Sequence, residues 1–140
     1  MLISIITEII LAALIITSFK GLQLSNDIII GSIKDAPEDK IIRRSAITLG
    51  ALLFLLWRAP ELAGEQDTDM ISKILFAILI YEAAGSAAML YYRDKYVDML
   101  NKTDRSGYPY LIKLPVAAEI LFFCYLFIKF IISEWGFLFS

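Results

Sequence analysis

The chain has 140 residues, 59% of them hydrophobic, and this apolar fraction exceeds what one soluble domain of that length can bury. Its 13 basic and 15 acidic residues argue against a nucleic-acid partner, because phosphates require a clustered basic face. Histidine is absent and Cys124 is the single cysteine, so the usual ligands of haem, zinc and iron–sulfur centres are missing and no cofactor or metal is expected.

Four long apolar blocks predict an all-α membrane protein, in which residues 1–140 form one bundle of four transmembrane helices. The first span, residues 2–19, contains one charge, Glu8, and covers about 30 Å at ~1.5 Å per residue. No basic residue precedes it and no small-residue cleavage motif follows it, so we expect it to remain uncleaved.

The other three spans follow recognisable helix-start signals. Residues 41–62 follow Asp35-Ala36-Pro37-Glu38, residues 70–92 follow a polar capping segment, and residues 110–135 follow a turn that contains Gly107 and Pro109. Residues 26–33 are apolar but too short to span, which favours an interfacial or partner-facing segment. Residues 93–100 keep a helical alternation of apolar and charged positions, so we expect the third helix to continue about two turns into the cytoplasm.

The basic residues are distributed unevenly between the two sides of the predicted bundle. The connections after the first and third spans hold ten of them, against three on the opposite side, and the positive-inside rule therefore places both termini outside the cytoplasm. The ten are Lys20, Lys34, Lys40, Arg43, Arg44, Arg93, Lys95, Lys102, Arg105 and Lys113, and the three are Arg58, Lys73 and Lys129.

Two charged groups lie in the outer part of the predicted bundle. Glu8 lies about 10 Å below the outer surface and Arg58 lies in the outer part of the second span, so the two residues could form a buried ion pair. Glu61, one turn after Arg58, is a competing partner nearer to water. Such a pair would either fix the register of the helices or take part in a charge relay.

Glu82 and Glu119 are the most informative embedded charges. Counted from the predicted helix ends, Glu82 lies about 18 Å from the outside and Glu119 about 13 Å from the inside, which is nearly the same depth. With no basic residue predicted in that layer, two facing carboxyls could not both be ionised and would share a proton or bind a cation. The structural alternative is that each carboxyl is protonated and hydrogen-bonded to a neighbour.

Small residues and one proline mark the same two spans. Ala84, Gly85 and Ala88 form a face that allows close approach of another helix. Pro115, four residues before Glu119, is expected either to kink the fourth helix beside that carboxyl or to adjust its packing.

No catalytic motif occurs in the chain, and no family is recognised in it, so we do not expect an enzyme. The leading hypothesis is an accessory subunit of a larger membrane complex, with the lipid bilayer and other subunits as its partners. A second is a small oligomeric transporter or channel that uses Glu82 and Glu119 to bind protons or cations. A third is a pore or immunity protein of the phage or bacteriocin type.

Overall fold

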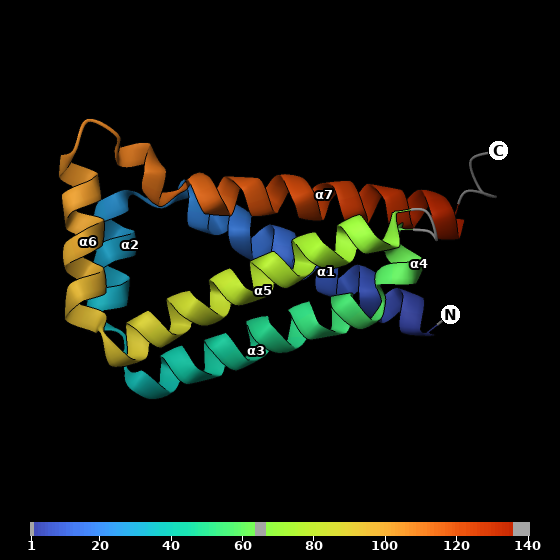
Figure 1. The fold of residues 1–140 in the computed structure, drawn as a ribbon, viewed down its shortest axis with the longest axis horizontal. Helices are drawn as coiled ribbons and strands as arrows, with labels where there is room; N and C mark the ends of the chain where they lie inside the picture. The colour runs from blue at the N-terminus through green and yellow to red at the C-terminus, as the bar shows by residue number, and fades with distance from the viewer. Residues whose placement is uncertain (1, 64–66, 136–140) are drawn as a thin grey trace.

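The computed structural model describes residues 2–63 and 67–135, and all regular structure within these ranges is helical. Four long helices form the body of the molecule (Figure 1): α1 (Leu2–Gln23), α3 (Glu38–Trp57), α5 (Thr68–Tyr91) and α7 (Leu114–Trp135). Three of them, α1, α5 and α7, are long and apolar enough to cross a membrane. The prediction of an all-α chain is confirmed, whereas α3 is too charged in its first turns to qualify by composition.

The second predicted span, residues 41–62, is divided by the structure into two helices. α3 begins at Glu38 directly after the extended residue Pro37, and it ends at Trp57. A short helix, α4 (Ala59–Ala63), follows Arg58. Pro60 explains the division, because it cannot donate the backbone hydrogen bond that would continue α3, whereas it fits the first turn of a new helix.

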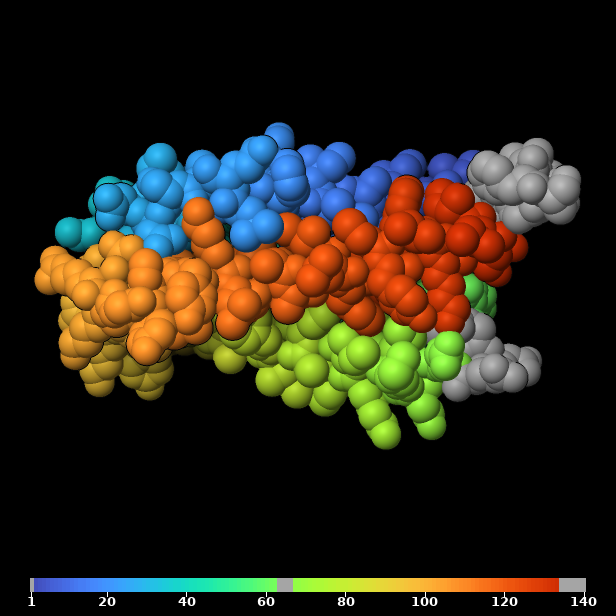
Figure 2. Space-filling view, turned by 90° about the horizontal axis from the view of Figure 1, so that it is seen from above, coloured from blue at the N-terminus to red at the C-terminus, as the bar shows by residue number. Residues whose placement is uncertain are grey.

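The long helices pack as two pairs, α1 along α7 and α3 along α5. The pairs meet at the end of the molecule where α1 begins and α7 ends, and there α4 contacts both α5 and α7. On the face seen in Figure 2, α7 runs between α1 and α5. The main apolar core fills this end and draws on all these helices: Leu11, Leu52, Leu55, Ala59, Leu62, Ile71, Leu75, Phe123, Leu126 and Phe130.

Two shorter helices, α2 (Asn26–Asp35) and α6 (Arg93–Arg105), lie side by side across the opposite end, transverse to the long helices (Figure 1). The expectation that residues 93–100 continue the third helix straight into the cytoplasm is wrong, because the chain turns at Tyr92. The turn buries Val97 and Leu100 of α6 against Ile30 of α2. A straight extension would leave these apolar side chains in water.

Side-chain hydrogen bonds fasten this end of the molecule. Arg93 donates to the carbonyl of Ala36 at 2.7 Å, directly after α2, and Lys113 donates to the carbonyl of Leu22 in the last turn of α1 at 3.1 Å. Cations at these positions satisfy carbonyls that a helix end leaves without partners and complement the helix dipole. Basic residues that indicate the cytoplasmic side by sequence therefore also hold helix ends in place.

Pro115 does not kink the middle of α7. The short 3₁₀ helix η1 (Pro109–Ile112) ends just before it, and α7 begins at Leu114. Pro115 therefore lies in the first turn of α7, where its missing N–H leaves no helical bond unmade. Of the two alternatives, the kink beside Glu119 is wrong, because Pro115 lies at the helix start and Glu119 follows one turn further on in α7.

Candidate functional site

The four long helices enclose one polar cavity of about 220 Å³ between the apolar core and the α2–α6 end. Each long helix contributes at least one polar side chain to its wall: Thr17 and Ser18 from α1, Arg44 and Thr48 from α3, Glu82 from α5 and Glu119 from α7. The remaining lining residues, Leu14, Leu52, Ile78, Val116 and Phe123, are apolar. Leu52 and Phe123 also belong to the core, which forms the floor of the cavity.

Glu82 and Glu119, which the sequence places at one depth, line the same cavity. Glu82 comes from α5 and Glu119 from α7, and both side chains are half-buried. Two carboxyl groups in one half-buried site repel each other when both are ionised, so the arrangement favours a proton shared between them.

Arg44 is the residue of this site that the sequence did not reveal. The sequence places it in the first cytoplasmic connection and predicts no basic residue in the carboxyl layer, but α3 begins at Glu38 and carries Arg44 nearly two turns into the helix. Its exposed side chain lines the cavity with Glu82 and Glu119. In the described part of the chain no ion pair within 4.0 Å joins Arg44 to either carboxyl. The helix start read at residues 35–38 puts Arg44 and Thr48 on one face, four residues apart, but it does not show that this face lines a cavity.

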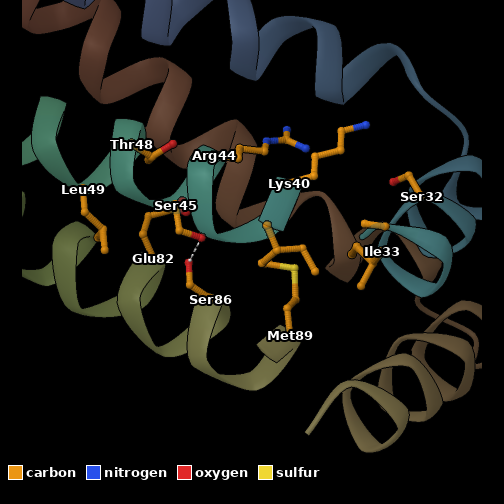
Figure 3. Close-up of a pocket in the computed structure, with 12 residues that line it drawn as sticks. Ser32, Ile33, Lys40, Arg44, Ser45, Thr48, Leu49, Glu82, Ser86 and Met89 are labelled. Carbon is orange, nitrogen blue, oxygen red and sulfur yellow. Dashed lines mark hydrogen bonds between the residues drawn. The ribbon is translucent and has the colours of Figure 1, made fainter. Parts of the chain in front are cut away.

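A second chamber of about 130 Å³ lies between α3 and α5 and extends towards α2. It shares Arg44, Thr48 and Glu82 with the central cavity. Figure 3 shows Lys40 and Arg44 extending from α3, while Glu82 lies between α3 and α5 close to the hydrogen bond of 2.8 Å that joins the hydroxyls of Ser45 and Ser86. The polar region is thus continuous from the carboxyl pair to the cationic end of α3.

Tyr96 connects this region to the transverse helices. Burial of the phenol raises the pKa of Tyr96 above its ordinary value, and the negative charge of Glu82 adds a smaller contribution in the same direction. Its phenol therefore stays protonated across the physiological range and remains a hydrogen-bond donor. The first turn of α6 thus supplies a polar group that lies within the electrostatic influence of Glu82.

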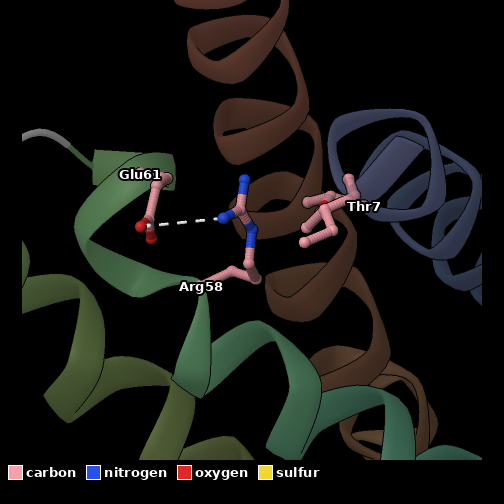
Figure 4. Close-up of polar contacts among 4 residues, drawn as sticks. Thr7, Arg58 and Glu61 are labelled. Carbon is pink, nitrogen blue, oxygen red and sulfur yellow. Dashed lines mark hydrogen bonds and ion pairs between the residues drawn. The ribbon is translucent and has the colours of Figure 1, made fainter. Parts of the chain in front are cut away.

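The charged groups near the other end form a separate cluster. Arg58 pairs with Glu61 at 3.6 Å, and Figure 4 shows its guanidinium between Glu61 and the buried Thr7. Glu61, which the sequence names as a competing partner of Arg58, therefore forms an ion pair with it. Arg58 Nε is buried without a hydrogen-bond partner among the described residues. The pairing of Arg58 with Glu8 stays a prediction.

The small-residue face of α5 is partly open to the outside of the bundle. Ala84 is exposed, Ala88 is half-buried, and a Cβ atom added to Gly85 would meet nothing within 4 Å. These residues do not mediate close helix packing within this chain. They leave a shallow strip on the outside of the bundle where another helix could approach.

No group of three or more potential metal ligands from His, Cys, Asp and Glu occurs within residues 2–63 and 67–135. Comparison with protein-family models, with curated proteins and with solved structures finds no match to this chain.

Proposed function

We propose that all four long helices, α3 included, lie in the membrane. The support is the packing of α3 along α5, which is long and apolar enough to span. A helix that runs beside a spanning helix shares its depth, so the apolar part of α3 from Ser45 to Trp57 lies in the hydrocarbon region and its charged first turns reach the headgroups. This arrangement accounts for both observations on α3: its charged first turns keep it from qualifying as a span by composition, yet it packs along a helix that does qualify.

The orientation follows from the same arrangement. Both connections that hold the ten basic residues lie at the α2–α6 end, so we propose that this end is cytoplasmic and that both termini are outside. In a Cys124→Ser background, Ser32→Cys and Ser106→Cys should react with a membrane-impermeant maleimide only after cells are permeabilised. Ser133→Cys, near the end of α7, should react in intact cells. External labelling at positions 32 and 106 would reverse the orientation.

We propose further that the protein is a small transporter in which Glu82 and Glu119 bind and release the coupling proton. The observation that carries this proposal is the cavity to which each of the four long helices contributes a polar side chain and which both carboxyls line. The apolar core closes the cavity towards the outer end, whereas its polar extension reaches towards the cytoplasmic end. A site closed on one side and reachable from the other is one state of an alternating-access cycle.

The purified full chain provides a direct test when it is reconstituted into liposomes made from the lipids of the expression host. A pH-sensitive dye trapped inside should report collapse of an imposed pH gradient faster than in protein-free liposomes, because the carboxyl pair carries protons across. Protein that moves no protons at any pH, with or without cation gradients, would contradict the proposal.

The accessory-subunit hypothesis is the second candidate, and one observation favours it: the strip of Ala84, Gly85 and Ala88 lies open on the outside of the bundle. In a membrane, such strips support close helix contacts through packing rather than through the hydrophobic effect. The partner could be another subunit or a second copy of this chain.

Blocking this strip tests the second candidate. Ala84→Leu combined with Ala88→Leu should weaken the association by about 1–3 kcal/mol through overpacking, seen as loss of co-purifying partner after mild detergent extraction from the native membrane. Ala83→Leu combined with Ala87→Leu is the matched control, because both alanines are exposed on the same helix about 100° away. Recovery of the protein alone, before and after substitution, would count against a subunit role.

A further inference from the structure

An apolar groove of about 240 Å³ between α1 and α3 opens beside the central cavity. Ile10, Ala13, Ile47 and Ala51 form its apolar walls, while Leu14, Thr17, Arg44 and Thr48 line both the groove and the cavity. The groove is therefore continuous with the polar site. Because α1 and α3 lie at membrane depth in the proposed arrangement, its apolar part faces lipid chains rather than water.

Arg44 stands at the junction of groove and cavity. It lines the groove, the central cavity and the second chamber, and Lys40 lies one turn before it on α3. Its guanidinium has no ion-pair partner in residues 2–63 and 67–135, and the hydroxyls of Thr17 and Thr48 lie in the same walls. A planar guanidinium in a wall that also carries hydroxyl groups is well suited to bind a phosphate.

The two carboxyls restrict which phosphate compounds fit. A ligand with negative charge alone would be repelled by Glu82 and Glu119 when they are ionised, whereas an ammonium group would be attracted to them. The cavity therefore offers one cationic and one acidic region, with an apolar groove beside them. This combination matches a zwitterionic headgroup attached to a hydrocarbon chain.

We propose, on the basis of the transport function proposed above, that the substrate is a membrane lipid whose headgroup carries a phosphate and a primary amine. The phosphate binds Arg44, the ammonium binds the Glu82–Glu119 pair, and the chain lies in the groove between α1 and α3. Lateral entry suits this class of substrate, because only the headgroup has to leave the lipid surface while the tail stays in an apolar environment.

Binding to the full chain in dodecyl maltoside micelles tests the proposal without any ion gradient. Native mass spectrometry should show that dioctanoyl phosphatidylethanolamine binds at least tenfold more tightly than dioctanoyl phosphatidylglycerol, which carries the phosphate without the amine. It should also bind at least tenfold more tightly than water-soluble phosphoethanolamine, which carries the headgroup without the chains. Equal binding of the glycerol lipid, or of the soluble headgroup, would overturn the proposal.

Two matched pairs of variants locate the site. Arg44→Gln should weaken binding at least tenfold, whereas Arg43→Gln should not, because Arg43 is exposed on the same helix and lines none of these cavities. Ala13→Phe should block the groove, whereas Ala46→Phe, at an exposed position outside it, should not. Equal loss in Arg43→Gln would mean that the lipid binds only through surface charge, and this would overturn the site.

The outcomes for the lipid site and for transport can be told apart. Tight and selective binding in a protein that moves no protons would leave the lipid site in place and contradict transport. Proton flux in a protein that shows no preference for the amine-bearing lipid would leave transport in place and contradict the substrate class. Circular dichroism and size-exclusion elution of each variant confirm that lost binding is not lost folding.

Discussion

Glu82→Gln and Glu119→Gln are each expected to reduce proton flux in liposomes at least tenfold, with the protein still folded. Glutamine keeps the shape of glutamate and much of its hydrogen-bonding capacity but cannot release a proton. Because the two carboxyls line one cavity and act together in the proposed proton site, the double variant should lose little more than either single variant. Flux is measured from the decay of an imposed pH gradient at equal amounts of reconstituted protein.

Glu8→Gln is the matched control for these variants. It removes the same type of group from a helix that can span the membrane, and Glu8 lines none of the cavities described above. Flux should stay close to that of the unsubstituted protein. Unchanged flux in the double Glu82 and Glu119 variant would show that both carboxyls are structural and would favour the subunit role instead.

Leu126→Ala should cause a clear loss of stability by truncating the core face of α7. Leu126 is fully buried in the core that joins the two helix pairs. Removing its methyl groups leaves a cavity where packing holds the bundle closed, and in a membrane, packing contributes most of the interhelical stability. We expect the free energy of unfolding to fall by about 2 kcal/mol, measured by reversible unfolding in mixed micelles of mild detergent and dodecyl sulfate.

Leu121→Ala on the same helix makes the same chemical change at a position that is 74% exposed. On the outside of a membrane bundle this side chain contacts lipid, which replaces the lost packing, so stability should change by less than about 0.5 kcal/mol. If both variants lost equal stability, α7 would not be held through the core face that the structure assigns to it.

The observed helix boundaries show which features of the fold can be predicted from short segments of sequence alone. The three spans with long uninterrupted apolar stretches appear as α1, α5 and α7, because length and hydropathy are properties of a single segment. The start signal at residues 35–38 agrees with α3, which begins at Glu38, whereas the predicted span 41–62 is divided after Trp57 by the start of α4. The transverse course of α6 was missed because its direction depends on the apolar face that α2 offers.

The sequence by itself determined that the chain is helical and rich in membrane-spanning segments, and that Glu82 and Glu119 lie at one depth. Depth along a helix follows from counting residues at a fixed rise, so it needs no knowledge of neighbouring helices. Only the tertiary structure decided that these carboxyls line one cavity, that Arg44 lines it with them, and that space remains beside Gly85 on α5. These facts depend on how each helix is rotated about its axis and which helix it contacts, and that choice is made by packing between segments far apart in the chain.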